Sequence, residues 1–377
     1  MGRRFVNSVR ERLARYRSRK RVPSVGLLGL EFSLERLNLV QIESGPGGLG
    51  VRGAACVSYP ADRESLFASP AQLRLLVREA LQSGPFRGNR VVTCLPASDA
   101  KMVHLNYEMR PGQVESDVVG KALQERLGAD LTGWVMDYIQ VRSDEQNAER
   151  SALAVAAPRE KVIAHLELLR RAGLEAEALE VGPVAIRRLV ASIPKEGNHP
   201  NVLVINVGAE QSYANAVWGR RLMSNREIGM GENQLVRRLS EHLEVAPAQA
   251  RRLVQEWGVY CRPEDRRREE HALVATLMEI LRPSFLTLVE EVTKALVYLA
   301  SVTRGGSAER VYLLGALARW PGADRFLEEV LGLPVEVPDP FEAFPGSRPT
   351  PPLERVKPVV GLVLAAGCAL RGFADLG

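Results

Sequence analysis

Cysteine and histidine are scarce in this sequence, and their spacing excludes two kinds of site. The four cysteines lie far apart, at Cys56, Cys94, Cys261 and Cys368. This spacing favours reduced, buried thiols in a cytoplasmic protein over a disulfide framework. The five histidines are scattered as well and lack the spacing of metal ligands. The sequence therefore predicts no metal site.

Long apolar runs and familiar catalytic motifs are also missing. Residues 356–370 are the most apolar candidate, but they fall short of the roughly 18 residues of a membrane helix and contain Lys357 and Pro358. We therefore expect neither a membrane span nor a signal peptide. The sequence contains no Gly-X-Ser-X-Gly, Walker or dinucleotide-binding motif, so it predicts no catalytic residue.

Positive charge is abundant only near the N-terminus. The 377 residues carry a formal net charge of +5. Residues 1–21 hold nine lysines or arginines against one acidic residue, which leaves the remainder slightly acidic. General nucleic-acid binding needs a basic face on the folded part of a protein. The charge distribution therefore argues against nucleic acid as a partner.

The basic N-terminal segment, residues 1–23, also has a helical pattern. Phe5, Val9, Leu13 and Tyr16 recur at intervals that place them on one face of a helix. Such a helix could lie on an anionic membrane, dock on a partner protein or remain a solvated tail, and the pattern leaves these alternatives open. The residues that would contact a membrane or a partner are Arg3, Arg4, Phe5, Arg10, Arg17, Arg19, Lys20 and Arg21.

Strand and helix patterns alternate from Ser24 onward. Residues 24–95 read as three strands, a helix that begins after Ser69, and a further strand. Residues 97–183 have the order strand, helix, strand, strand, helix, strand, which is that of a ferredoxin-like unit. The first series recurs with helical insertions over residues 201–337. Two related α/β halves are typical of a two-lobed protein with a ligand cleft between the lobes.

The most informative stretch is residues 201–226, NVLVINVGAEQSYANAVWGRRLMSNR. It opens with an apolar run broken only by Asn206, which predicts a strand buried on both faces. Gly208 follows and allows a tight turn, after which two more strand-like segments can return as a hairpin. This arrangement is a candidate phosphate cradle. A purely structural strand and turn would produce the same pattern.

Four segments together resemble the actin-like ATPases of the FtsA type, and within them the PilM family of type IV pilus assembly proteins. Two intermediate stretches agree as well, and the resemblance covers nearly everything after residue 24. The four segments are LGLEFSLERLNLVQIE (28–43), NVLVINVGAEQSYANAVWGRRL (201–222), VYLLGALARWPGADRFLEEVLGLPVEV (311–337) and VVGLVLAAGCALRGF (359–373). The intermediate stretches are residues 154–181 and 226–253.

The resemblance implies an α/β fold of the actin-like, ribonuclease-H-like class, with two lobes and an inserted ferredoxin-like β-α-β-β-α-β subdomain. The implied segments are the basic N-terminal segment (1–23), the first part of the first lobe (24–96), the inserted subdomain (97–183), a helix and linker of the first lobe (184–200), the phosphate-2-like hairpin of the second lobe (201–228), its helical subdomain (229–305), its adenosine-side part (306–340), a Pro-rich loop (341–356) and the closing helix of the first lobe (357–373).

The resemblance also implies a nucleotide cleft, although the residues there depart from the family pattern. Glu31 and Asn206 stand where the family has the aspartates that hold Mg²⁺ or its waters, and the lysine often found near the nucleotide falls on Val254. These departures argue against ATP hydrolysis, so we expect no required cofactor, and ATP with Mg²⁺ only if a nucleotide binds. The implied nucleotide-binding residues are Glu31, Ser33, Asn206, Gly208, Gly231, Glu232, Gly315 and Ala316.

The function implied by the resemblance is that of a non-enzymatic scaffold at the cytoplasmic face of the inner membrane. It would bind the short cytoplasmic peptide of a PilN-like single-span protein, in a type IV pilus or a related MSHA-type machine. Other platform proteins, the assembly ATPase and self-association are further candidates for contact. The alternatives are an ATP-binding switch or weak ATPase of the same machine and an FtsA-like filament protein. The filament protein is disfavoured because no amphipathic helix follows the last apolar segment.

Overall fold

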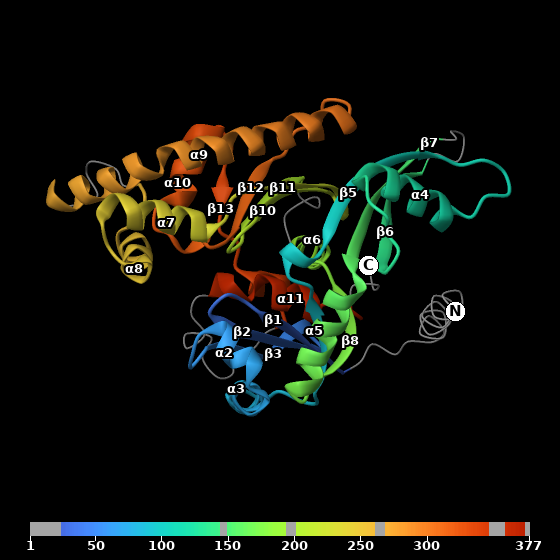
Figure 1. The fold of residues 1–377 in the computed structure, drawn as a ribbon, viewed down its shortest axis with the longest axis horizontal. Helices are drawn as coiled ribbons and strands as arrows, with labels where there is room; N and C mark the ends of the chain where they lie inside the picture. The colour runs from blue at the N-terminus through green and yellow to red at the C-terminus, as the bar shows by residue number, and fades with distance from the viewer. Residues whose placement is uncertain (1–23, 144–148, 194–200, 261–267, 347–358, 374–377) are drawn as a thin grey trace.

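A computed structural model describes residues 24–143, 149–193, 201–260, 268–346 and 359–373. The N-terminal segment with its predicted contact residues, the thiol of Cys261 and most of the Pro-rich loop lie outside these residues. The described chain forms two lobes and an inserted three-stranded sheet. In Figure 1 the first lobe lies below, the second lobe above and the inserted sheet to the right.

The first lobe is built on a five-stranded sheet with the order β3-β2-β1-β4-β8. Neighbouring strands from β1 to β3 are antiparallel, whereas β1, β4 and β8 run parallel to one another. Leu28 and Leu30 on one face of β1 are fully buried with residues of α3 and α5, and α6 and α11 cover the other face. The strands are β1 (Val25–Phe32), β2 (Arg36–Gly45), β3 (Gly48–Ser58), β4 (Arg90–Cys94) and β8 (Glu175–Glu180). The helices are α2 (Arg63–Ala68), α3 (Pro70–Gln82), α5 (Arg159–Arg171), α6 (Gly182–Val190) and α11 (Val363–Ala369).

The second lobe has a sheet of related topology, β11-β10-β9-β12-β13. As predicted, β9 is buried on both faces: Leu203 and Ile205 pack under α7 to α10, while Val202 and Val204 pack toward α6 and α11 of the first lobe. The strands are β9 (Val202–Val207), β10 (Ser212–Trp218), β11 (Arg221–Ile228), β12 (Arg310–Gly315) and β13 (Val335–Glu336). The helices are α7 (Glu232–Leu243), α8 (Pro247–Trp257), α9 (Arg268–Val302) and α10 (Ala323–Leu331).

Helix α9 is long and apolar enough to cross a membrane by length and composition alone. Its side chains at Leu277, Phe285, Leu288 and Leu299 instead belong to the core of the second lobe. One face of the helix therefore packs into the core of that lobe. The helix runs through Pro283 without ending.

The inserted sheet differs from the predicted unit in one respect. Its strands pair in the order β5-β7-β6, with β5 at Lys101–Glu108, β6 at Trp134–Ser143 and β7 at Glu149–Pro158. Helix α4 (Glu115–Leu127) packs on this sheet. A complete ferredoxin-like unit would hold its fourth strand in the same sheet. Here that strand, β8, pairs with β4 of the first lobe, so the element order was predicted correctly and the expected pairing was wrong.

Two helices differ from what the local sequence patterns predicted: α2 was not predicted, and the closing helix is shorter than expected. Residues 63–68 form the short helix α2, capped by Asp62, whose carboxylate accepts a hydrogen bond from the Ser65 amide at 2.9 Å. The predicted closing helix over 357–373 is shorter: a 3-10 turn at Val359–Leu362 leads into α11. A single helical turn has too few residues to show apolar periodicity, so neither feature was apparent from the sequence.

Helix α11 sits tightly between β1 and α6. A Cβ atom on Gly29 of β1 would lie 1.9 Å from the carbonyl oxygen of Ala365, and one on Gly367 would lie 2.2 Å from that of Ala185. Glycine at both positions lets the backbones touch. The first lobe also holds a buried ion pair between Glu180 of β8 and Arg188 of α6, with two oxygen–nitrogen distances of 2.7 and 2.8 Å.

Candidate functional site

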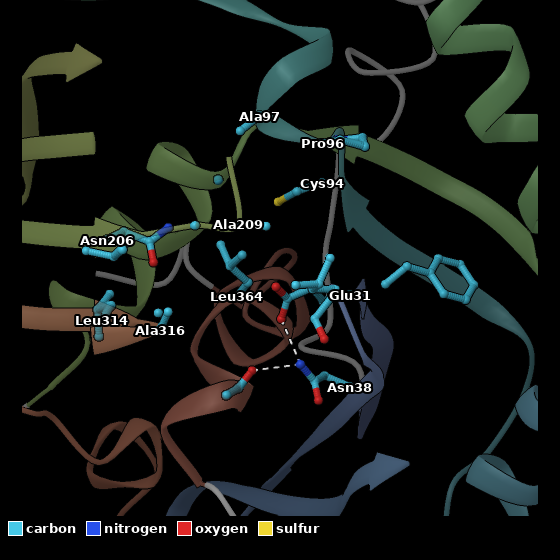
Figure 2. Close-up of a pocket in the computed structure, with 18 of the residues that line it drawn as sticks. Glu31, Asn38, Cys94, Pro96, Ala97, Asn206, Ala209, Leu314, Ala316 and Leu364 are labelled. Carbon is cyan, nitrogen blue, oxygen red and sulfur yellow. Dashed lines mark hydrogen bonds between the residues drawn. The ribbon is translucent and has the colours of Figure 1, made fainter. Parts of the chain in front are cut away.

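The two lobes enclose a cleft of about 310 Å³. Its walls are the turn between β1 and β2, the end of β4, the turn between β9 and β10, the start of α7, the end of β12 and the segment that leads into α11. Figure 2 shows these walls converging on one space, with Glu31 and Asn206 supplied by different lobes. The carboxyl ends of β4, β9 and β12 all border the cleft, which is where open α/β sheets usually bind ligands.

The structure brings the residues implied as nucleotide-binding together. Of these residues, Glu31, Ser33, Asn206, Gly208, Glu232, Gly315 and Ala316 line the cleft. Gly231 lies immediately behind it, where an added Cβ atom would be 2.3 Å from the Ala209 carbonyl oxygen. Gly315 has a positive φ of 75°, and a Cβ there would be 2.1 Å from the carbonyl oxygen of Val207.

Glu31 is held by its own neighbours at the end of β1. Asn38 of β2 donates from Nδ2 to Glu31 Oε2 at 3.0 Å and to the carbonyl oxygen of Gly361 at 2.9 Å, as the dashed lines in Figure 2 show. Burial raises the pKa of the Glu31 carboxyl to about 7, against the lowering effects of the Asn38 hydrogen bond and the Arg319 charge. Glu31 is therefore partly protonated at neutral pH.

Several backbone amides that could cradle a phosphate are hydrogen-bonded within the protein. They belong to the turn after β1, the turn after β9, the start of α7 and the end of β12. The bonds run from Ser33 N to Arg36 O (2.9 Å), Gly208 N to Gln211 O (3.1 Å), Glu232 N to Gly208 O (2.9 Å), Asn233 N to Ala209 O (2.9 Å) and Ala316 N to Val207 O (2.8 Å).

Charged side chains at the cleft pair with one another. Glu232, the first residue of α7, contacts Arg319 at 3.2 Å and Arg251 at 3.8 Å. Arg251 also lies 3.3 Å from Glu35 in the turn between β1 and β2. Neither arginine was predicted from the sequence as a residue of the site. Arg251 lies three residues before Val254 on the same helix, so the position of the expected lysine was the available clue.

Two cysteines also line the cleft, a position that the sequence did not predict for them. Cys56 lies 3.1 Å from Asn38 Oδ1, and Cys94 at the end of β4 lies 3.5 Å, sulfur to sulfur, from the buried Cys368 of α11. Hydrogen bonding to Cys368 and burial raise the pKa of the Cys94 thiol. Of the three described cysteines, only Cys368 is fully buried, and all three are free thiols.

Comparison with known proteins identifies the family. The family described as type IV pilus assembly protein PilM matches residues 29–373. The chain belongs to the PilM family. A solved PilM-PilN type IV pilus biogenesis complex is similar in structure, with a TM-score of 0.71 at 23% identity over 93% of this chain and 99% of that one. The predicted actin-like, two-lobed α/β fold is thereby confirmed.

Two further solved structures have lower scores. EutJ, an ethanolamine utilization protein from Carboxydothermus hydrogenoformans, has a TM-score of 0.49 at 16% identity, covering 92% of this chain and 90% of its own. MreB 5 of Spiroplasma citri bound to AMPPNP has a TM-score of 0.49 at 11% identity, covering 93% of this chain and 97% of its own.

The fold family implies a nucleotide with a magnesium ion, and the residues present do not fit one. Mg²⁺ is usually bound through one or two carboxylates. Asn206 has no carboxylate, and that of Glu31 is hydrogen-bonded to Asn38 with a raised pKa. A triphosphate would also meet Glu35 and Glu210 in the lining and amides that already have acceptors.

Proposed function

We propose that this PilM-family protein is a non-catalytic scaffold of a type IV pilus, or related MSHA-type, assembly machine. Its partner would be a PilN-like single-span membrane protein, bound through that protein's short cytoplasmic N-terminal peptide. Family membership and the similarity to a PilM-PilN complex support this partner. Binding the peptide would hold the scaffold at the cytoplasmic face of the inner membrane. The basic N-terminal segment would add a contact with lipid or with another platform protein.

The observation that carries the proposal is a cluster of exposed apolar side chains on β6 and α5. The two elements contact each other where the inserted sheet meets the first lobe. Exposed apolar side chains that gather at one place mark interaction sites. The four residues, each between 38% and 47% exposed, are Val135 and Ile139 on one face of β6 and Ile163 and Leu166 on α5. We call this set the β6–α5 patch.

The architecture around the β6–α5 patch suits an extended peptide. Strand β6 is an edge strand of the inserted sheet, because β7 pairs it on one side and β5 lies beyond β7. Edge strands and the grooves beside them bind extended peptides through their backbones and apolar pockets. Leu169 of α5 is fully buried in the first-lobe core, so this helix anchors the patch to a rigid element. Ile163 and Leu166 are spaced three residues apart, on one face of that helix.

The proposed scaffold works without ATP hydrolysis. Support comes from the Asn206 amide and the hydrogen-bonded Glu31, where an actin-like ATPase would have metal-binding aspartates. The phosphoryl transfer that such enzymes catalyse depends on positioned cations and phosphates.

Peptide binding tests the proposal. A labelled synthetic peptide with the N-terminal cytoplasmic sequence of a PilN-like protein is titrated with the full-length protein, and fluorescence anisotropy gives the Kd. We expect Ile163→Asp or Leu166→Asp to weaken binding by at least about tenfold, since each places a charge among apolar contacts. Leu75→Asp is the matched control, because Leu75 is an exposed apolar residue of α3, 52% exposed and outside the patch. Equal affinity of all variants would refute this location, and failure of the unchanged protein to bind would refute the partner.

A further inference from the structure

A chain of ion pairs connects the two lobes across the cleft. Glu232 has a side chain that is only 2% exposed, and its carboxylate is contacted by Arg319 and Arg251 of the second lobe at 3.2 and 3.8 Å. Arg251 extends to Glu35 of the first lobe at 3.3 Å and donates from Nη2 to Asn233 Oδ1 at 2.9 Å. We call the set Glu35, Arg251, Glu232 and Arg319 the charge bridge.

The surroundings of Glu232 are those of an anion site. The residue begins α7, where the helix dipole favours negative charge. Two guanidinium groups face its carboxylate, and arginines at a helix N-terminus are the usual partners of phosphate groups. The N-terminal amides of Glu232 and Asn233 point to the carbonyl oxygens of Gly208 and Ala209. The anion that the arginines hold is therefore a carboxylate of the protein itself.

We propose that the Glu232 carboxylate is a resident anion in the place that a nucleotide phosphate would take in an actin-like protein. Arg251 then links this anion to Glu35, so that the charge bridge holds the two lobes together without nucleotide. The mismatch between the cleft and a magnesium-bound triphosphate agrees with this arrangement, because Arg319 of the cleft lining is already paired with Glu232. The inference does not depend on the PilN-like partner.

The contacts of the charge bridge differ in strength. The pairs that involve Glu232 are largely shielded from water, with Arg251 and Arg319 side chains 20% and 24% exposed. Removing one partner from such a site leaves a poorly solvated charge, which is strongly destabilising. Glu35 is 45% exposed, so its contact with Arg251 is weaker and easier to break. Loss of Glu232 should therefore lower stability, whereas loss of Glu35 should mainly loosen the lobes.

Anion rescue tests the resident anion. Glu232→Ala should raise the unfolding equilibrium constant at least roughly tenfold, and millimolar formate should restore much of that stability by filling the emptied site. Glu232→Gln should be destabilised without rescue, because its amide still fills the space. Glu43→Ala is the control, since Glu43 forms an ion pair with Arg52 at 2.6 Å outside the cleft. Wild-type stability in Glu232→Ala, or an equal formate effect on every variant, would overturn the proposal.

Small-angle X-ray scattering of the full-length protein tests the link between the lobes. Glu35→Gln removes the first-lobe charge at a half-exposed position and should fold even where Glu232 variants do not. We expect a larger radius of gyration for Glu35→Gln than for wild type, and an unchanged value for Glu43→Gln. An unchanged value in Glu35→Gln would show that the charge bridge does not hold the lobes together.

Discussion

Glu31 and Asn206 occupy corresponding positions on β1 and β9, and both line the cleft. Asn206 cannot ionise. Glu31 can, but burial raises its pKa and the Asn38 amide already bonds one of its oxygens. At the scale of single residues, the side chains at the two positions where the resemblance implies aspartates therefore supply less negative charge than two aspartates would. The sequence predicted this change of chemistry, whereas the role of Asn38 in it became apparent only from the paired strands.

The raised pKa of Glu31 predicts a specific pH dependence. Its pKa is about 7 in the folded protein against an ordinary value of 4.5, so folding favours the protonated form. Stability associated with this group is present below pH 4.5 and is lost as the pH rises through 7. Glu31→Gln cannot ionise, and its side-chain oxygen can still accept from Asn38. We expect the variant to be more stable than wild type at pH 8, by up to about 3 kcal/mol, with the gain shrinking toward pH 4.5.

Urea denaturation at pH 5 and pH 8 measures this difference. Glu43→Gln provides the control for removal of a carboxylate at an exposed ion pair. A gain that is the same at both pH values, or a variant that is less stable than wild type at pH 8, would contradict the assigned environment of Glu31.

Helix α11 shows how one element organises the first lobe. It packs against β1 and α6 at backbone-contact distance, and its Cys368 meets Cys94 of β4. Nearby, burial acts to raise the pKa of Glu180, but hydrogen bonds and charge from Arg188, together with Arg371, lower it below its ordinary value. The family resemblance implied a closing helix over residues 357–373. The need for glycine within it follows from the neighbouring backbone, which local sequence does not show.

Gly367→Ala tests the close packing of α11. The added methyl group would lie 2.2 Å from the Ala185 carbonyl oxygen, so α6 has to move. We expect a loss of roughly 1–3 kcal/mol in the free energy of unfolding. Gly120→Ala in α4 is the matched control, because its Cβ would lie 3.4 Å from the flexible end of Met136. That change should be neutral or stabilise by up to about 1 kcal/mol, since alanine favours helix more than glycine does. Equal losses in the two variants would contradict the packing.

Contacts between distant segments set the relation of the lobes in the whole molecule. Besides the charge bridge, the inserted sheet docks on the second lobe through Lys101 and Glu227 at 3.2 Å and through an edge-to-face contact of His104 with Tyr298, with ring centroids 5.7 Å apart. Thus the inserted sheet contacts the second lobe as well as the first.

Nucleotide titration is the test at this scale. We expect no shift in the thermal unfolding midpoint of the full-length protein at millimolar ATP, with or without Mg²⁺. Arg319 of the cleft is paired with Glu232, Glu35 and Glu210 add negative charge to its lining, and Asn206 stands where the resemblance implies a metal ligand. A nucleotide that bound the folded state with a micromolar Kd would raise stability by about 4 kcal/mol at a concentration 1,000 times the Kd. Tight Mg²⁺-dependent binding with turnover would instead support the ATP-driven switch.

The sequence by itself determined the order of the elements and the buried strand β9. Its resemblance to a known family implied the two-lobed fold and the presence of Glu31 and Asn206 where aspartates are expected. The element order and strand β9 depend on residues close together in the chain, where periodicity, turns and motifs can be recognised. Only the tertiary structure decided that β8 pairs with β4 and that Arg251 joins Glu35 to Glu232. Such contacts join segments up to hundreds of residues apart, and many different pairings satisfy the same local pattern. Which one forms depends on packing across the whole chain.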